Sequence, residues 1–139
     1  YEEDILLDIR LNVLDKYVKK FVITEATYTH NGSKKKLNFN IQNFIKFKDK
    51  IEYIIVDQQP PSIKEINKND AAEISEEKLI LNGMARDYYQ RECLKKGLKN
   101  LDKDDLIIIS DLDEIPNLEN LFGLVLKQLN IKILFHPNG

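Results

Sequence analysis

Hydrophobic and polar positions change along the chain in a way that predicts helices and strands in alternation. Over residues 4–18, apolar side chains recur at spacings of three and four, which predicts an amphipathic helix with one buried face. The run 21–24 is short, apolar and rich in β-branched residues, which favours a buried strand that ends at Glu25. The expected buried stripe of the helix is Leu6, Ile9, Val13, Leu14 and Tyr17.

A second helix and strand follow a polar loop. Residues 26–39 include Thr, His, Asn, Gly and three consecutive lysines, a composition typical of a loop. Residues 41–49 then predict a short helix, and residues 51–56 predict a strand that stops at Asp57. A polar stretch, 58–77, connects this strand to the next element.

A long helix and two further strands complete the pattern. Residues 106–109 are apolar at every position, which predicts a strand covered on both faces of its sheet. Pro116 begins another helix that reaches 129, and residues 131–135 predict a last strand. The long helix spans 78–98, and its expected stripe is Leu79, Met84, Tyr88, Arg91, Leu94 and Leu98.

Strands separated by helices predict an α/β fold with a mainly parallel sheet flanked by helices. The 139 residues, 42% of them hydrophobic, suit a single domain. Ligands of open α/β sheets bind beyond the carboxyl ends of the strands. The positions to examine therefore follow Thr24, Val56 and Ile109.

Charge and composition exclude several classes of function. A net charge of -2 gives no electrostatic basis for binding nucleic acid. No apolar run approaches the ~20 residues that a transmembrane helix needs. Cys93 is the only cysteine, so an internal disulfide and a cysteine-based zinc site are impossible. The acidic start shows no targeting segment, and a reducing compartment is the natural expectation.

Three carboxylates follow the strand 106–109 within four residues. Asp111, Asp113 and Glu114 would repel one another unless a cation or ordered donors offset their charge. Carboxylate oxygens suit Mg²⁺ or Mn²⁺, which commonly bind one or two carboxylates together with substrate phosphates. The pattern indicates a diphosphate-metal clamp. The alternative is a solvated acidic turn in which Asp113 or Glu114 caps the helix that Pro116 begins.

Other polar residues are weaker candidates on their own. Glu25 ends the first strand, and Thr29 and His30 follow it, so these side chains could hydrogen-bond a sugar or a base. The alternative is that these residues belong to an ordinary polar loop with no binding role. In the long helix, Gln90 precedes Arg91, which could pair with phosphate or with one of the carboxylates, or be an ordinary surface arginine.

Taken together, these segments resemble glycosyltransferase family 17, the β-1,4-mannosyl-glycoprotein N-acetylglucosaminyltransferases and their bacterial and viral relatives. The resemblance covers residues 3–116, and its last block is the most specific. Its four blocks, in order, are Glu3 with 6–11 (LLDIRL), 21–26 (FVITEA) with 29–32 (THNG), 89–91 (YQR), and 104–116 (DDLIIISDLDEIP).

The resemblance implies a GT-A-like, Rossmann-like nucleotide-diphosphosugar domain that transfers N-acetylglucosamine from UDP-GlcNAc to a glycan hydroxyl with inversion. It implies that Asp111 and Asp113 form the D-x-D motif that binds Mn²⁺ or Mg²⁺ at the diphosphate. The metal would act as a Lewis acid on the leaving UDP. By the same resemblance, the donor is surrounded by Glu25, Thr29, His30, Gln90 and Arg91.

The chain also departs from the family pattern. Family members usually have a strand before the Asn-Glu pair, which corresponds here to Glu2 and Glu3, and after Pro116 the resemblance ends. We therefore expect residues 1–139 to be a single partial GT-A-like domain. An inverting transferase needs a general base, and no residue of this sequence is identifiable as that base. A microbial or viral chain is expected in the cytoplasm, and one that has lost an N-terminal anchor in the Golgi lumen.

Two rival functions fit parts of the pattern. A haloacid dehalogenase-like phosphatase also carries D-x-D after a strand, but usually continues with Gly-Thr, whereas Glu114 and Ile115 follow here. Phosphatase activity that is lost in Asp111→Asn would support it. The other rival is a non-catalytic nucleotide- or glycan-binding remnant of a transferase, which predicts UDP binding without turnover.

Overall fold

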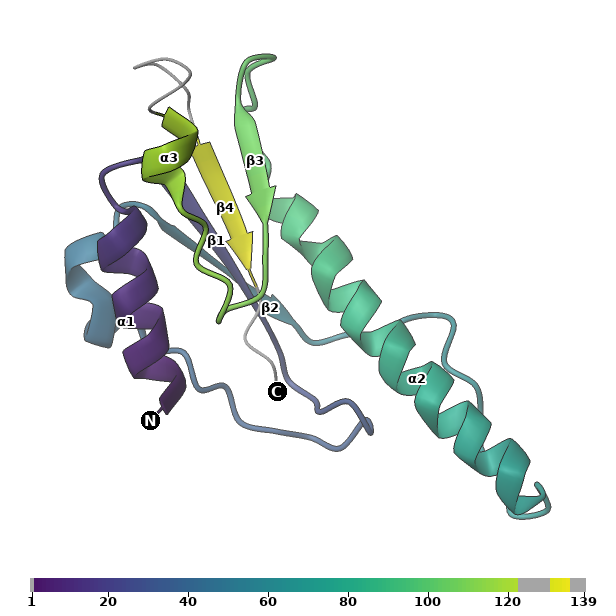
Figure 1. Ribbon diagram of the computed structural model, residues 1–139. Helices are drawn as coiled ribbons and strands as arrows, with labels where there is room; N and C mark the ends of the chain where they lie inside the picture. Colours follow the sequence, from purple (N-terminus) through teal and green to yellow (C-terminus); the bar gives the residue numbers. More distant parts are fainter. Residues whose placement is uncertain (1, 123–130, 136–139) are drawn as a thin grey trace.

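Among the residues that the structure describes, four parallel strands form one sheet in the order β2-β1-β4-β3 (Figure 1). This computed structural model describes residues 2–122 and 131–135. The predicted α/β fold with a parallel sheet is confirmed, as is the last predicted strand. The strands are β1 (Val18–Ala26), β2 (Ile51–Val56), β3 (Leu106–Ile109) and β4 (Ile131–Phe135).

Helices cover both faces of this sheet (Figure 1). Alternate residues of β1 point to opposite faces, so Phe21 and Ile23 pack in the cluster that contains α1 residues, whereas Val22 packs against Leu94 on the other side. The helices of the first face are α1 (Glu2–Leu14), the 3-10 helix η1 (Ile41–Phe47) and α3 (Leu118–Phe122); those of the second are α2 (Ala72–Cys93) and the 3-10 helix η2 (Leu94–Gly97).

Most predicted elements are present with shifted bounds. The strands 51–56 and 106–109 are confirmed as predicted, and β1 is longer at both ends than the predicted run. The long helix begins at Ala72, inside the segment predicted to be a polar connection, and gives way to η2 after Cys93. α3 begins at Leu118 rather than at Pro116, and the predicted continuation of this helix over 123–129 lies outside the described residues.

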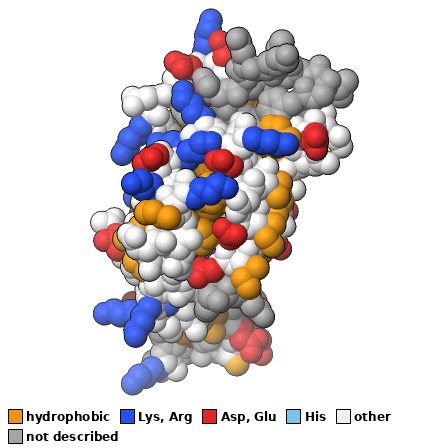
Figure 2. Space-filling view, turned by 90° about the vertical axis from the view of Figure 1, so that its left-hand side faces the viewer, with side chains coloured by type: hydrophobic (Ala, Val, Ile, Leu, Met, Phe, Trp, Pro, Cys, Tyr) orange, Lys and Arg blue, Asp and Glu red, His pale blue; other side chains and the backbone are white. Residues whose placement is uncertain are grey.

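The buried face of α1 differs from the predicted one. Ile9 and Val13 are 47% and 48% exposed, whereas Leu7, Arg10 and Leu11 are buried. Of the predicted stripe, Leu14 is buried and Leu6 and Tyr17 pack at the edge of the core. The predicted stripe and the observed one, Leu7, Arg10, Leu11 and Leu14, both have helical spacing. The observed stripe is the one that buries the Arg10 side chain. Figure 2 shows this side of the molecule, where exposed hydrophobic side chains lie among charges of both signs.

The buried face of α2 also differs from the predicted one. Of the predicted stripe, Leu79, Met84, Tyr88 and Arg91 are exposed, whereas Leu94 is buried and Leu98 packs beside it, both beyond the end of α2. Within α2, the buried residues are Asn82, Arg86 and Cys93. Polar contacts hold this helix: the Asn82 side chain accepts from the Lys64 N–H and donates to the Lys64 carbonyl, both at 2.8 Å. The spacing of apolar residues therefore did not predict the buried face of α2, because hydrogen bonds of Asn82 to the segment at Lys64 determine which side of the helix faces inward.

The strand β3 is covered on both faces only in part. Leu106 and Ile108 pack against the α1 side and Ile107 against the Leu94 side, but Ile109 is 60% exposed. Because β3 is at the edge of the sheet, helices overlap it less than they overlap β1. Its exposed carboxyl end leads directly into the acidic turn.

Candidate functional site

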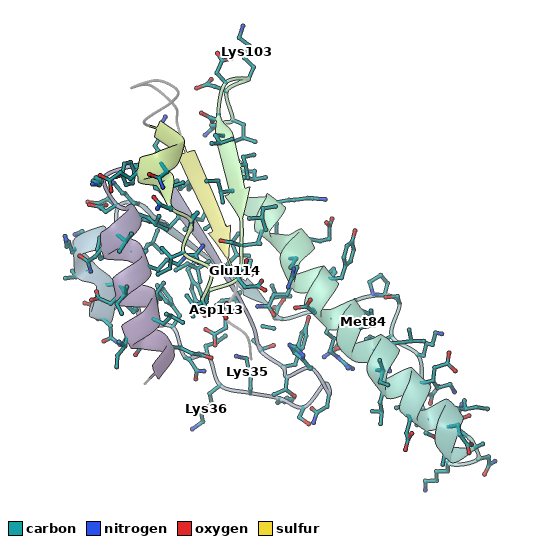
Figure 3. The ribbon with its side chains drawn as sticks, viewed as in Figure 1. Lys35, Lys36, Met84, Lys103, Asp113 and Glu114 are labelled. Atoms are coloured by element: carbon teal, nitrogen blue, oxygen red, sulfur yellow. The ribbon has the colours of Figure 1, made fainter. Side chains whose placement is uncertain are left out.

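The parallel strands bring three loops to one edge of the sheet. Ala26 pairs with Val56 in register, and Ile109 pairs with Leu134 of β4. The segments that begin at Thr27, Asp57 and Ser110 therefore leave the sheet at the same edge. Figure 3 shows Asp113 and Glu114 on the loop that leaves the arrowhead end of β3.

The acidic segment 110–114 forms a tight turn. The Glu114 N–H donates to the Asp111 carbonyl at 3.1 Å, and the Glu114 carboxylate accepts from the Asp111 N–H at 3.1 Å. Leu112 is buried, whereas Asp113 and Glu114 are exposed. Glu114 thus stabilises its own turn, and at the start of α3 the Asn117 side chain accepts from the Asn120 N–H at 3.3 Å. Glu114 does not cap α3.

Arg10 of α1 lies beneath this turn. The side chain is fully buried, and its guanidinium donates to the carbonyl oxygens of Asp111, Leu112 and Glu114 at 2.6, 3.1 and 2.7 Å. It also hydrogen-bonds the Ser110 hydroxyl. The sequence alone predicted no role for Arg10, although its position between Leu7 and Leu14, on a second stripe with helical spacing, indicated that it faces the core.

Arg91, a predicted donor-binding residue, contacts the acidic turn. Its guanidinium lies 3.2 Å from the Asp111 carboxylate and 3.3 Å from that of Asp87 on the same helix. Of the two pairings considered for Arg91, phosphate or carboxylate, the structure shows the one with a carboxylate. The Arg91 side chain is 44% exposed, so the pair contributes at most about 1 kcal/mol to stability.

Gln90, the neighbour of Arg91, links α2 to the end of β1. Its side-chain amide donates to the Thr24 carbonyl at 3.2 Å. The contact holds the C-terminal half of α2, and therefore Arg91, against the sheet edge that carries the acidic turn.

Glu25 is 1% exposed and accepts four hydrogen bonds. Its Oε1 accepts from Asn38 N–H at 2.8 Å and from Lys35 Nζ at 3.2 Å; its Oε2 accepts from Phe39 N–H at 3.1 Å and from Tyr53 OH at 2.8 Å. Burial alone would raise the pKa of this carboxyl group, but the four donors outweigh burial and lower the pKa below its ordinary value. Glu25 thus organises the segment that follows the Thr29–His30 loop.

The Thr29–His30 loop is held by an arginine that sequence reasoning missed. Arg86 donates to the His30 carbonyl at 2.8 Å and to the Gln59 side chain at 2.7 Å, so it joins the loops that follow β1 and β2. The Thr29 hydroxyl contacts the Asn31 side chain at 2.5 Å, and the His30 side chain is exposed. The sequence pattern that could have indicated Arg86 is its spacing of four residues from Gln90, which places both side chains on the same face of α2.

We expect Gly32→Ala to lower the free energy of unfolding by about 2 kcal/mol. Gly32 has a φ of 88°, which costs an L-residue roughly 1–2 kcal/mol, and an added Cβ would lie 2.5 Å from Arg86 Nη2. Urea unfolding measures the change. Gly83→Ala is the matched control, because its Cβ would make only an ordinary 3.7 Å contact and alanine favours a helix interior. Equal stability of Gly32→Ala and the native chain would contradict the prediction.

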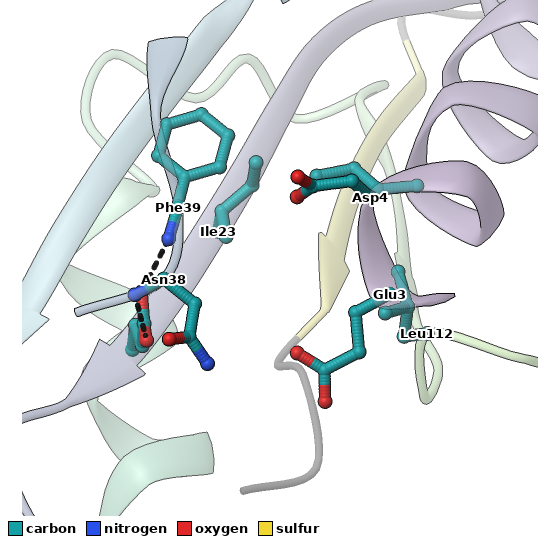
Figure 4. Close-up of a pocket in the computed structure, with 8 residues that line it drawn as sticks. Glu3, Asp4, Ile23, Asn38, Phe39 and Leu112 are labelled. Atoms are coloured by element: carbon teal, nitrogen blue, oxygen red, sulfur yellow. Dashed lines mark hydrogen bonds between the residues drawn. The ribbon is translucent and has the colours of Figure 1, made fainter. Parts of the chain in front are cut away.

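A narrow cleft separates the start of α1 from the end of β1 (Figure 4). It encloses about 330 Å³ including its open mouth. The Glu3 carboxylate points into the cleft across from Asn38 (Figure 4). Burial raises the pKa of Glu3, and nearby Lys35 opposes this effect. Glu25 and the acidic turn, through Leu112, border the same cleft. The lining residues are Glu3, Asp4, Leu7, Ile23, Glu25, Asn38, Phe39 and Leu112.

The structure therefore brings Asp111 and Arg91 into direct contact and places Glu25 beside the cleft that the acidic turn borders. Thr29 and His30 belong to a loop fastened separately to α2 by Arg86. Within residues 2–122 and 131–135, no three His, Cys, Asp or Glu side chains converge in a way that could hold a metal ion alone. None of the described helices is long and apolar enough to cross a membrane.

This arrangement defines an α/β protein with a carboxylate turn at the carboxyl edge of a parallel sheet. Residues 1–130 match the model of Glycosyltransferase family 17, and the chain belongs to that family. The resemblance of the four sequence blocks is confirmed. The match also extends past Pro116, where the resemblance was expected to end.

Three curated relatives share the name Beta-1,4-mannosyl-glycoprotein 4-beta-N-acetylglucosaminyltransferase. The human and rat proteins are each 30% identical to this chain and the mouse protein is 29% identical, over 129 residues that cover 87% of the chain. The chain corresponds to about a fifth (21%) of the length of each relative. No solved structure matches the chain significantly.

Proposed function

We propose that this chain forms the donor-binding part of a GT-A-like N-acetylglucosaminyltransferase domain, with UDP-GlcNAc as donor and a glycan hydroxyl as acceptor. The observation that carries the proposal is the acidic turn 110–114 at the carboxyl edge of the sheet, in a chain that belongs to glycosyltransferase family 17. The names of the relatives supply the transferred sugar and the glycoprotein type of acceptor. Inversion at the sugar carbon belongs to the same proposal.

The donor set of the turn fits a hard divalent cation that is completed by a ligand. Asp111 and Asp113 offer two carboxylates, and Mg²⁺ sites typically combine one or two carboxylates with phosphate oxygens and water. The absence of a third convergent ligand among the described residues agrees with a site that needs the diphosphate. Bound Mn²⁺ or Mg²⁺ would supply Lewis-acid stabilisation of the leaving diphosphate.

The chain's own residues would position the donor. Arg91 already lies at Asp111 and is partly exposed, so its guanidinium can reach a phosphate oxygen that approaches the turn. Gln90 holds that part of α2 against β1. Glu25, buried and saturated with donors, would act on the donor through the segment 35–39 that it fastens. The loop of Thr29 and His30 would border the donor on the side away from the acidic turn.

Calorimetric titration of UDP-GlcNAc and UDP, with and without Mn²⁺, tests the proposal. We expect binding that requires Mn²⁺ and that Asp113→Asn weakens at least tenfold, because the exposed Asp113 loses its charge with little effect on folding. Asp104→Asn makes the same chemical change at the other end of β3 and should bind like the native chain. Metal-independent binding, or no binding by a folded native chain, would contradict the proposal.

Two further assays separate the rival functions. Release of UDP in the presence of a glycan acceptor distinguishes a transferase from a module that only binds. Hydrolysis of a generic aryl phosphate that Asp111→Asn abolishes would instead support the phosphatase.

A further inference from the structure

Arg10 is a fully buried charge whose guanidinium hydrogen-bonds the acidic turn at four residues. Three backbone carbonyls, from Asp111, Leu112 and Glu114, converge on one guanidinium nitrogen, and the second nitrogen hydrogen-bonds the Ser110 hydroxyl. The partners are 100 to 104 positions away in the sequence. The Arg10 side chain thus joins α1 to the turn by hydrogen bonds, beside the packing of Leu112 in the core cluster that contains Leu7.

The direction of these hydrogen bonds determines which groups of the turn face outward. Because the carbonyl oxygens of residues 111, 112 and 114 point inward to the cation, the carboxylates of Asp113 and Glu114 are left exposed. A guanidinium is charged at neutral pH, so Arg10, which hydrogen-bonds the turn from below, offsets part of the repulsion among the three carboxylates.

We propose that Arg10 is a positioning residue that sets the Asp111 and Asp113 carboxylates in a cation-binding arrangement before any cation arrives. The inference rests on the proposed function, since the cation belongs to it. A cation binds more tightly to carboxylates that are already held in place, because no conformational entropy of the loop is lost when the cation binds. A free turn with three neighbouring carboxylates would otherwise spread apart.

Lysine cannot replace arginine in this role. A guanidinium presents its five N–H donors in a planar fork, and here two of its nitrogens span Ser110 and the carbonyls of three further residues. An ammonium group keeps the charge but concentrates its donors at one point. Arg10→Lys should therefore retain the electrostatic contribution and lose the geometric one, which makes it the informative variant.

The test measures Mn²⁺ affinity in the presence of UDP, together with hydrogen exchange of the Glu114 amide in the ligand-free chain. We expect Arg10→Lys to bind Mn²⁺ at least tenfold more weakly and to exchange the Glu114 amide at least tenfold faster, because the turn loses its anchor. Leu94→Val is the control, because Leu94 is buried in a separate cluster on the opposite face of the sheet. This substitution should lower thermal stability and leave the structure of the turn unchanged.

The outcomes separate this inference from the function on which it rests. A native chain that binds no Mn²⁺ overturns both. A native chain that binds Mn²⁺, with Arg10→Lys equal to it in affinity and exchange, overturns only the role of Arg10. If Arg10→Lys fails to fold, Ser110→Ala removes one acceptor of the same guanidinium and should weaken Mn²⁺ binding about threefold; unchanged affinity in that variant overturns the role.

Discussion

Glu25→Gln is expected to lower the free energy of unfolding by about 3 kcal/mol at neutral pH. The carboxylate is buried and accepts from two backbone N–H groups, the Tyr53 hydroxyl and the Lys35 ammonium. A glutamine presents an NH₂ group to one pair of these donors, so at least one backbone N–H loses its acceptor, and the partly buried Lys35 ammonium loses its counter-charge. Removing one partner of a buried charged network typically costs about 2–5 kcal/mol.

The same substitution should change the acid sensitivity of the fold. The pKa of Glu25 is lower in the folded chain than in the unfolded chain, where it is about 4.3. A depressed carboxyl pKa contributes stability that is fully present above the unfolded pKa and is lost as the pH falls through the folded pKa. The native chain therefore loses this contribution below about pH 4, and the difference between the native chain and Glu25→Gln narrows there.

Urea unfolding at pH 7 and at a series of acid pH values measures both effects. Glu76→Gln provides the matched control, because Glu76 is an exposed residue of α2 and the same chemical change should leave stability within about 0.5 kcal/mol of the native value. A constant difference between the native chain and Glu25→Gln from pH 7 to pH 3 would show that the charge of Glu25 does not contribute as proposed. We also expect segment 35–39 to become less ordered in Glu25→Gln, because Glu25 holds the Asn38 and Phe39 N–H groups at the border of the cleft.

Gly97→Ala is expected to destabilise the fold by about 2–3 kcal/mol. Gly97 is buried in η2, and an added Cβ would lie 2.7 Å from Val22 Cγ2, closer still to Val22 Cγ1, and 3.1 Å from Val22 Cβ. Val22 is fully buried in the central region of β1 and is β-branched, so its side chain has few rotamers available to move away. Overpacking of a dense core typically costs about 1–3 kcal/mol.

The double variant Gly97→Ala/Val22→Ala identifies the cause of this effect. Val22→Ala alone removes two methyl groups from the core and lowers stability, but it also makes room for the new Cβ. We expect the double variant to be more stable than the sum of the two single effects predicts, by at least about 1 kcal/mol, because the residues are in direct contact. Strict additivity, measured by thermal or urea unfolding, would mean that the clash with Val22 is not the source of the loss.

The strands and the family could be predicted from the sequence. The runs 51–56 and 106–109 are apolar and β-branched over the length of a strand, and this local preference was sufficient to place β2 and β3 correctly. The order of the four blocks likewise identified glycosyltransferase family 17. The acidic turn was recognisable as a candidate site because its carboxylates directly follow a strand in an α/β pattern.

The inward faces of the helices could not be predicted in this way. In α1 the stripe with Ile9 and Val13 and the stripe with Leu7 and Leu11 both have helical spacing, so apolarity alone does not distinguish them. The choice follows from Arg10, whose acceptors lie beyond β3. In α2 the choice follows from Asn82 and Arg86, which bond to Lys64 and to the His30 loop.

The strands, their alternation with helices, the family and the acidic turn could be predicted because hydrophobic pattern and motif are local properties of the chain. The place of Arg10 beneath that turn and the four donors around Glu25 follow instead from how the folded chain brings distant segments together. These buried polar side chains are stable only where their partners are assembled around them. In this chain the order of the parallel strands brings together groups that are up to 104 residues apart.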